Sequence, residues 1–293
     1  LMSPTDILLA LAIVSIWGLN FVVIKIGLQD LSPIALTVLR FAFAALPMAF
    51  FIKRPAIPWH LLCAFGLFQF ALQFTFLFTG MQLGLTSGLA SLVMQLQVFF
   101  TIALAILFIG ERPRITQLVG ALIAFCGMAL VAYKLESKAT LIGFMLVIIA
   151  SMCWATGNIV TKKIGRVNPL ALMIWGSLIS LPPLLIASLL MEGTAGWIIA
   201  AHNMNWRAFA TVLYQAYPNT MFAFGAWAVL MRKYPAATVA PFTLLVPIIG
   251  MICAALILDE ALQWWKLAAC GLVLGGLAFN QFGQRWLDRR GLL

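Results

Sequence analysis

Long apolar runs alternate with short polar connections along the whole chain. Ten of these runs approach the roughly 20 mostly apolar residues that a helix needs to span a bilayer. They cover residues 5–27, 33–52, 59–80, 86–109, 115–133, 140–161, 169–190, 206–230, 236–258 and 264–282. The connections between them are too short to hold a soluble domain. The pattern therefore predicts an all-α polytopic membrane protein with ten transmembrane helices.

Composition agrees with this prediction. Hydrophobic residues make up 64% of the 293 positions and charged residues 9%, whereas a soluble domain carries about 25% charged residues. The first apolar run lacks the basic leader and the small-residue cleavage site of a signal peptide. We therefore expect it to be retained as the first span.

The net charge is +10, from 18 Lys and Arg against 8 Asp and Glu. In a soluble protein this excess would suggest a nucleic-acid partner. With the N-terminus inside, however, the outer connections hold only Lys134, Lys138, Arg207 and Lys266, and most other basic residues lie in inner connections and the tail. Because inner loops retain positive charge, we expect a multi-pass protein of a bacterial inner membrane with both termini cytoplasmic. Its surroundings are then lipid, and we expect no nucleic-acid partner.

The metal-ligating residue types are sparse. Five cysteines fall inside apolar runs without a Cys-x-x-Cys motif, and the two histidines have no ligand-type neighbour at helical spacing. Cysteine often serves as a small buried hydrophobe, so the sequence predicts no disulfide framework, no metal site and no cofactor.

Short sequence matches recur in the same order in the two halves of the chain. They pair Asn20, Lys25, Ile26 and Gly27 with Asn158, Lys163, Ile164 and Gly165, Ser32 to Leu36 with Asn168 to Leu172, Pro47 with Pro183, Gly110-Glu111 with Asp259-Glu260, and Gly127 with Gly276. Five spans per copy is an odd number, so the second copy enters from the opposite face. We predict two inverted five-helix repeats, 1–137 and 138–293, with a central substrate cavity near the midplane between them.

The quoted motifs also resemble a known family. Trp17-Gly18-Leu19-Asn20-Phe21, the Gly110-Glu111 and Asp259-Glu260 turns, and the small-residue fifth and tenth spans are similar to the ten-helix, EamA-like branch of the drug/metabolite transporter superfamily. Within it the chain looks closest to bacterial exporters of aromatic amino acids or of cysteine and O-acetylserine. The resemblance implies inverted repeats around a central cavity and export from the cytoplasm. The second copy departs from the opening motif, reading Trp154-Ala155-Thr156-Gly157-Asn158.

Polar side chains within the apolar runs are the candidate substrate-binding residues, because they are costly in hydrocarbon unless satisfied. They are Trp17, Asn20, Arg40, Gln69, Gln73, Gln95, Trp154, Asn158, Tyr214, Tyr217 and Trp227. Amides donate to a carboxylate and accept from an ammonium, which suits a zwitterion. The structural alternatives are interhelical hydrogen bonds for the asparagines, a structural kink with locally satisfied hydroxyls for Tyr214 and Tyr217, and core packing for Trp227.

Two inferences within this set rest on helical geometry. Gln95 and Gln97 point about 200° apart, so both cannot line one cavity, and Gln95 is chosen. Arg40 lies seven residues beyond Pro33, about 10 Å along the helix. It could hold a substrate carboxylate or snorkel to the outer interface.

Pro218, Pro241 and Pro247 are candidate hinges or gates, and the alternative for each is a static bend. No Asp or Glu falls in the middle of a predicted span, so the chain lacks the usual relay for protons. We therefore expect alternating-access export of amino acids and related metabolites that is facilitated rather than proton-coupled, by a monomer or weak homodimer. The alternatives are a proton-coupled multidrug or metabolite exporter and a non-transporting membrane assembly protein; an enzyme is not expected.

Overall fold

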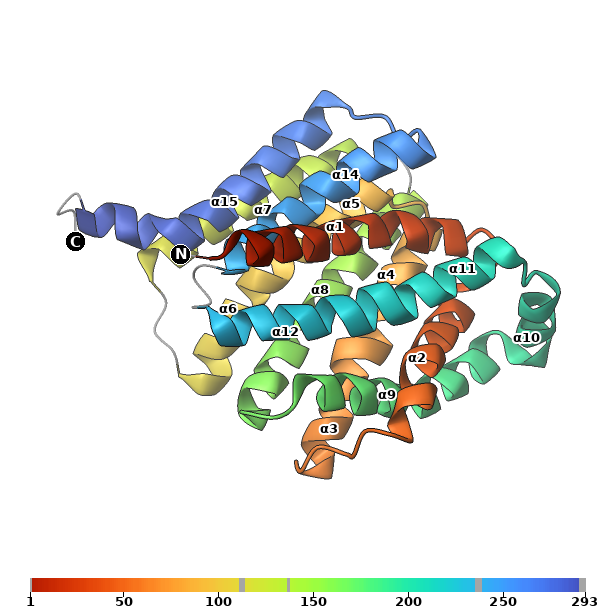
Figure 1. Ribbon diagram of the computed structural model, residues 1–293. Helices are drawn as coiled ribbons and strands as arrows, with labels where there is room; N and C mark the ends of the chain where they lie inside the picture. Colours follow the sequence, from red (N-terminus) through yellow and green to blue (C-terminus); the bar gives the residue numbers. More distant parts are fainter. Residues whose placement is uncertain (1, 111–113, 136–137, 235–238, 290–293) are drawn as a thin grey trace.

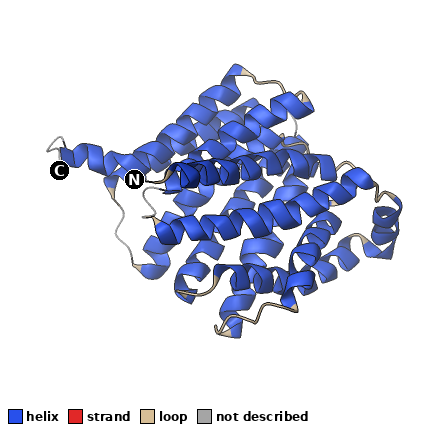
Figure 2. Cartoon of the chain, in the orientation of Figure 1, coloured by secondary structure: helices blue, strands red, loops and turns tan. Residues whose placement is uncertain are grey.

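The computed structural model describes residues 2–110, 114–135, 138–234 and 239–289. These residues form helices joined by turns, with no strand among them (Figure 2). The first half contains α1 (Pro4–Gly27), α2 (Pro33–Ala49), α3 (Trp59–Phe65), η1 (Gly66–Leu72), α4 (Gln73–Gln82), α5 (Ser87–Val93), η2 (Met94–Leu96), α6 (Gln97–Ile109) and α7 (Ile115–Lys134). The second contains α8 (Lys138–Ile164), α9 (Pro169–Met191), α10 (Gly193–His202), α11 (Trp206–Tyr214), η3 (Gln215–Ala223), α12 (Phe224–Lys233), η4 (Ala240–Leu244), α14 (Leu245–Leu258) and α15 (Trp264–Arg289).

In the part of the chain that the structure describes, each of the ten predicted runs coincides with a helical stretch. Within the described residues, 6 stretches are long and apolar enough to cross a membrane by length and composition: Pro4–Gly27, Trp59–Gln82, Ser87–Ile109, Ile115–Lys134, Thr140–Ile164 and Pro169–Met191. Two shorter apolar stretches are Pro33–Ala49 and Phe242–Leu258, and the stretches 206–233 and 264–289 are also helical. That all ten cross the membrane stays a prediction. Helix α10 lies where the sequence indicated only a connection.

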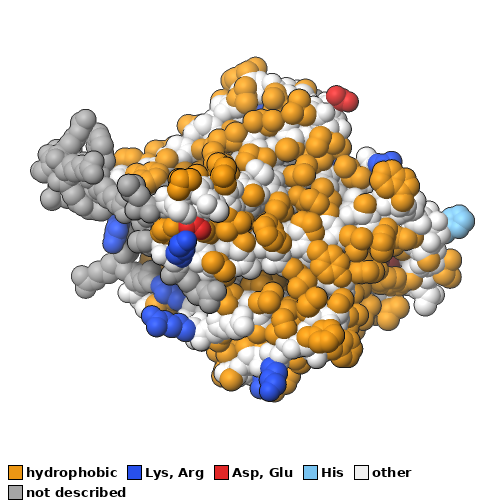
Figure 3. Space-filling model, in the orientation of Figure 1, with side chains coloured by type: hydrophobic (Ala, Val, Ile, Leu, Met, Phe, Trp, Pro, Cys, Tyr) orange, Lys and Arg blue, Asp and Glu red, His pale blue; other side chains and the backbone are white. Residues whose placement is uncertain are grey.

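The molecular surface is largely apolar. Figure 3 shows hydrophobic side chains spread over the visible face, with the blue and red charged groups mainly near its edges. Large apolar side chains such as Leu107, Leu122 and Leu190 are mostly exposed. A soluble protein rarely leaves so much contiguous apolar surface open to water, so this distribution is typical of a protein surrounded by lipid.

Helix ends explain several of the sequence matches. Ser32 and Asn168 are the N-caps of α2 and α9, where each side chain accepts a backbone N–H bond and is followed by a proline at the first helical position. This combination satisfies otherwise orphan donors and presets the backbone. Gly110 and Asp259 both end a helix in the left-handed conformation, with φ of 76° and 53°. The repeated motifs are thus matched helix boundaries.

Helices from the two halves pack against one another throughout. α7 lies along α15, α1 along α14, α2 against α9 and α4 against α8, and Figure 1 shows α7 and α15 side by side. A Cβ added at Gly120 would lie 2.5 Å from the Gly276 carbonyl oxygen, and one at Gly127 would lie 3.0 Å from that of Ala269. Small residues let helix backbones approach closely in membranes. Gly271 faces open space instead.

Four irregular segments interrupt the long helices at corresponding places. The third and eighth helical stretches contain the π-helical segments η1 and η3, and the fourth and ninth contain the 3₁₀ segments η2 and η4. In η3 the cause is local, because Pro218 has no backbone N–H to donate. Such segments often mark functional sites or hinges.

Candidate functional site

Arg40 lies inside the bundle, with 0% of its surface exposed. Its Nη2 atom donates to Thr220 Oγ1 at 3.1 Å, and Nη1 makes a long 3.5 Å bond to Gln215 Oε1. Both partners belong to η3, so the guanidinium links α2 to the irregular part of the eighth stretch. Among the described residues, an ion pair joins Lys233 to Asp6, and none involves Arg40. The charge of Arg40 is therefore held by neutral partners, and snorkelling to an interface is excluded in this conformation.

Aromatic rings complete the surroundings of this guanidinium. Arg40 Cζ lies 3.9 Å from the centre of the Phe74 ring and 5.2 Å from that of Phe41. Phe41 also contacts Phe70 and Phe74. The negative faces of these rings attract a cation in a dry site. They partly offset the desolvation of Arg40, but they leave its net charge uncompensated.

Helix α1 lies against the other side of the eighth stretch. Tyr214 donates its hydroxyl proton to the Ile16 carbonyl oxygen at 2.9 Å. The ring of Trp17 packs against those of Phe224 and Trp227, with centroids 5.3 and 5.2 Å apart. The predicted residues Trp17, Tyr214 and Trp227 are therefore brought together at one helix contact. In this conformation Tyr214 joins two helices.

Within the described residues, several buried polar atoms of these helices make no hydrogen bond. The donors are Trp17 Nε1, Arg40 Nε and Gln215 Nε2, and the acceptors are Asn20 Oδ1, Gln69 Oε1 and Asn219 Oδ1. An unpaired buried polar atom costs free energy, so a native protein normally has a use for each one. Donors and acceptors in such a set suit a ligand that carries both an anionic and a cationic end.

Gln69 and Gln73 lie where η1 meets α4, and both are buried. Gln69 Nε2 donates to Gln73 Oε1 at 3.4 Å. The Gln69 side chain also contacts the backbone at Gly157 on α8, where a Cβ would collide with it. The predicted cavity-lining pair thus faces the interior, between helices of the two halves.

Asn158 makes the interhelical contact that was the structural alternative for it. Its Nδ2 atom donates to Gln97 Oε1 at 2.9 Å and to Thr101 Oγ1 at 3.1 Å. Gln97, which the sequence argument set aside, is therefore the partner of Asn158. In the predicted repeat, Gln97 and Thr101 correspond to Val246 and Gly250 of α14, and neither of these has a polar side chain. The two matched asparagines consequently differ: Asn158 is bonded, and Asn20 Oδ1 is not.

Gln95 lies apart from Arg40. It lines a pocket of about 200 Å³ together with Gln117, Thr243 and Asn280, among others. These residues come from η2, α7, η4 and α15. Gln95 and Gln97 therefore face different surroundings, as their helical separation predicts.

The remaining predicted residues have less specific surroundings. Trp154 is half-buried against the core, and Tyr217 is half-buried in η3. Pro218 lies in η3, Pro241 in the 3₁₀ segment η4, and Pro247 in α14, where it is buried. All three prolines thus belong to the irregular segments or to the helix that continues one. Their roles as hinges stay predictions.

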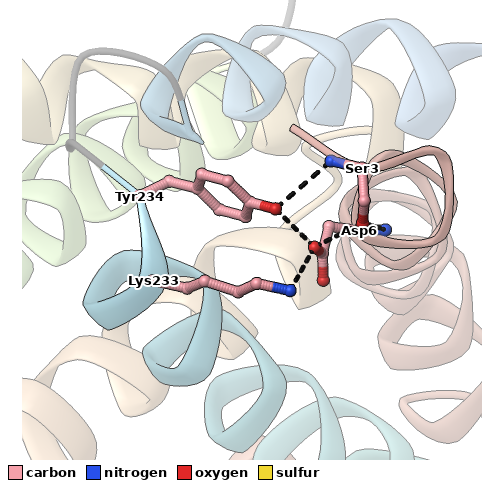
Figure 4. A network of polar contacts seen from close by, with 4 residues as sticks. All are labelled: Ser3, Asp6, Lys233 and Tyr234. Carbon is pink, nitrogen blue, oxygen red and sulfur yellow. Dashed lines mark hydrogen bonds and ion pairs between the residues drawn. The ribbon is translucent and has the colours of Figure 1, made fainter. Parts of the chain in front are cut away.

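Polar contacts tie α1 to its neighbours at both ends. At its start, Lys233 Nζ pairs with Asp6 Oδ2 at 2.6 Å, and the Tyr234 hydroxyl donates to the same oxygen (Figure 4). The Asp6 carboxylate accepts a hydrogen bond that raises the pKa of Lys233 above its ordinary value of 10.5. At the other end of α1, Lys25 Nζ donates to the Met81 carbonyl oxygen at 2.9 Å.

A further polar contact links the residues after α14 to the start of α5. Glu260 accepts from the backbone N–H groups of Ser87 and Gly88, at 2.8 and 3.3 Å. Ser87 and Gly88 open helix α5, where a negative charge is favoured. This carboxylate holds the end of α14 against the start of α5.

Fold and site together define a helical membrane protein with a buried, incompletely satisfied polar centre. The chain belongs to the EamA-like transporter family, whose model matches residues 5–133 and 141–281. It is 41% identical over 291 residues to a protein of Escherichia coli K12 named "Probable amino-acid metabolite efflux pump", with 97% of each chain covered. A Salmonella typhimurium protein of the same name is 40% identical, again with 97% of each chain covered.

Two more distant comparisons extend this assignment. An Escherichia coli K12 protein named as an inner membrane transporter is 23% identical, covering 93% of this chain and 89% of its own. Together with the apolar helices, it supports a multi-pass protein of the bacterial inner membrane. A crystal structure with 17% identity superposes with a TM-score of 0.66, covering 98% of this chain and 100% of the other. That likeness shows the fold alone.

Proposed function

We propose that this protein exports amino acids and related small metabolites across the bacterial inner membrane by alternating access. The observation that carries the proposal is the buried Arg40 guanidinium, whose partners are all neutral. A substrate carboxylate supplies the missing negative charge. The relatives named as amino-acid metabolite efflux pumps support the same class of substrate.

An amino-acid zwitterion complements the unpartnered atoms on α1, α2 and η3. Its carboxylate accepts from Arg40 Nε and Gln215 Nε2, and its ammonium donates to oxygens such as Asn20 Oδ1. Charge-assisted hydrogen bonds are about twice as strong as neutral ones. Trp17 and Trp227 supply an apolar wall for the side chain of the substrate.

The proposed architecture is a pair of inverted five-helix repeats, 1–137 and 138–293, with ten membrane crossings. Its support is the paired irregularities: η1 corresponds to η3, η2 to η4, and the capped start of α2 to that of α9. The helix contacts support the same correspondence. α1 packs against α14 in the ninth stretch, and α8 packs against the fourth stretch in the same way. Helix α10 has no counterpart and is an insertion in the second copy.

The conformation described here is a closed one. Asp6 and Lys25 lie 19 residues apart on α1, about 28 Å at 1.5 Å per residue, and contacts fasten the helix at both positions. Alternating access requires one set of contacts to open at a time. Positive-inside charge places the Asp6 contact at the cytoplasmic end. The π-helical segment η3, which contains Pro218, packs against α1 between the Asp6 and Lys25 contacts. A bend in η3 would separate the helices at one of these two contacts.

Transport is proposed to be driven by the substrate gradient. The spans carry no mid-membrane Asp or Glu in the sequence, and proton relays in transporters usually need such a group. The rival function is a proton-coupled metabolite exporter. A non-transporting assembly protein and an enzyme find less support, because the family is one of transporters.

A counterflow experiment tests this function. Purified protein is reconstituted into liposomes loaded with one unlabelled amino acid, and uptake of the labelled compound is followed without any ion gradient. We expect uptake above that of protein-free liposomes for at least one member of an amino-acid panel. Failure across the panel by folded protein contradicts amino-acid transport. Uptake that requires an imposed proton gradient replaces the facilitated mechanism with the proton-coupled one.

A further inference from the structure

A second pocket lies away from the Arg40 site, between the connection after α2 and the start of α9. It measures about 410 Å³ and is lined by residues 52–56 together with Arg166, Val167, Asn168 and Ala171. Figure 1 shows this connection and the start of α9 near the lower edge of the view. The pocket joins segments from the two halves of the chain.

Three of its lining side chains are cationic: Lys53, Arg54 and Arg166. The lining contains no Asp or Glu. Within the described residues, no ion pair is formed by Lys53 or Arg166, and both are exposed. Like charges around one pocket repel each other, so the arrangement favours an anionic occupant that carries several acceptor oxygens.

The shape of the pocket is fixed by contacts that leave the charges of Lys53 and Arg166 unpaired among the described residues. Arg54 Nη1 donates to the Ile57 carbonyl oxygen at 3.2 Å, and its guanidinium stacks 4.3 Å from the Trp59 ring centre. Trp175 Nε1 donates to the Ile52 carbonyl oxygen at 2.9 Å, which ties the connection to α9. The cationic groups therefore belong to a preformed site.

The border of the pocket is apolar on one side. Phe50 and Phe51 directly precede the lining segment and are 84% and 83% exposed, and Trp59 is also exposed. Exposed aromatic residues beside basic ones are typical of the membrane interface. An occupant with an anionic phosphate and acyl chains would contact both kinds of side chain, whereas a free phosphate would leave Phe50 and Phe51 unused.

We propose that this pocket binds the phosphate headgroup of an anionic phospholipid, with its acyl chains against Phe50 and Phe51. Basic pockets between transmembrane helices bind such headgroups by the same physics. The site lies outside the proposed transport pathway and does not depend on the transport function. Phosphate is the chemistry shared with a soluble phosphate ester, which the test separates from lipid.

The test compares lipid retention between variants. Purified protein exchanged into mixed micelles with equal phosphatidylglycerol and phosphatidylcholine is examined by native mass spectrometry. We expect retained phosphatidylglycerol in the unmodified protein and a loss of roughly tenfold or more in the Lys53→Gln/Arg166→Gln double variant. Lys163→Gln is the matched control, because Lys163 is an exposed cation close in sequence that does not line the pocket. Equal retention by the double variant and the control overturns the proposal.

Two further arms keep the result interpretable. If the double variant does not fold, the selectivity of the unmodified protein for phosphatidylglycerol over phosphatidylcholine decides, and absence of selectivity overturns the proposal. Inorganic phosphate and glycerol phosphate are added in a thermal-shift assay with and without phosphatidylglycerol. If the soluble phosphates stabilise the protein and phosphatidylglycerol does not, the pocket binds a free phosphate compound, and the lipid proposal is overturned.

Discussion

Replacing Arg40 by methionine separates the structural and functional accounts of this residue. Methionine has a similar length and keeps contact with Phe74, but it removes the charge and the bonds to Gln215 and Thr220. Removal of a buried, uncompensated charge is often neutral or stabilising. Against this, two acceptors lose a partner, at about 1–3 kcal/mol for each that stays unsatisfied. Because these terms oppose each other, we expect the melting temperature to change by only a few degrees.

Transport should change far more. A hydrogen bond to a charged group contributes about 1.5–3 kcal/mol, and each 1.4 kcal/mol corresponds to a factor of ten in affinity. Loss of the carboxylate contact should therefore raise the half-saturating substrate concentration about 10- to 100-fold. Arg40→Lys should fall between, because it keeps the charge without the planar fork.

Counterflow with an amino acid and with its amide measures the carboxylate contact directly. The unmodified protein should prefer the acid, and Arg40→Met should lose that preference while transporting both slowly. Arg207→Met serves as the matched control, because Arg207 is exposed and bonds Gln29 elsewhere. If Arg40→Met retains the full preference for the acid over the amide, the role of Arg40 in binding the carboxylate is wrong.

Three other predictions follow from the contacts described. Asn158→Ala should lower thermal stability, by about 0.6–2 kcal/mol for its interhelical bonds. Asn20→Ala should instead slow counterflow and leave the melting temperature unchanged. The reverse pattern contradicts a structural role for Asn158 and a binding role for Asn20. Gly120→Val should reduce the yield of monodisperse protein in size-exclusion chromatography, because its Cβ would meet the Gly276 carbonyl oxygen, and Gly271→Val, which faces open space, should not. Asp6→Asn should weaken the Lys233 contact and widen the spin-label distance between the start of α1 and the end of α12, and an unchanged distance excludes this contact as a closure.

Sequence patterns predicted the helices because the signal is local. Apolar runs mark the ten helical stretches, and the Ser-Pro and Asn-Pro pairs mark the starts of α2 and α9 through capping that needs no distant partner. The close approach at Gly120 and Gly127 was also accessible, since small residues indicate tight helix contacts. Each of these features depends on residues within a few positions of one another.

The irregular segments and the side-chain partners were not accessible in the same way. η1 (Gly66–Leu72) contains no proline, so nothing in its own sequence predicts a π-helical turn. Arg40 and Thr220 are 180 positions apart, and the choice between snorkelling and burial depends on that contact. Gln97 was set aside because helical geometry says which residues share a face, but not which neighbouring helix the face meets.

The two proposed copies are most informative where they differ. Arg40 lies seven residues after Pro33, and the residue seven positions after Pro169 is Gly176. Gly176 nevertheless contacts the corresponding irregular segment. Gly66 opens η1 as Gln215 opens η3, and a Cβ added at Gly66 would lie 2.7 Å from the Gly176 carbonyl oxygen. The corresponding crossing thus holds close backbone and apolar side chains such as Phe65 and Ile179 in one proposed copy, and a buried cation with polar partners in the other.

Packing requirements apply equally to both crossings, so they do not explain why one of them bears a costly charge. The same contrast holds for Asn158, which is bonded, and Asn20, whose Oδ1 is free among the described residues. Asn20 and Arg40 belong to α1 and α2 of the proposed first copy, and both helices pack against η3, which carries the unpaired Gln215 Nε2 and Asn219 Oδ1. A binding site for an asymmetric zwitterion needs this kind of one-sided polarity, since a symmetric arrangement would present identical groups to its two unlike ends.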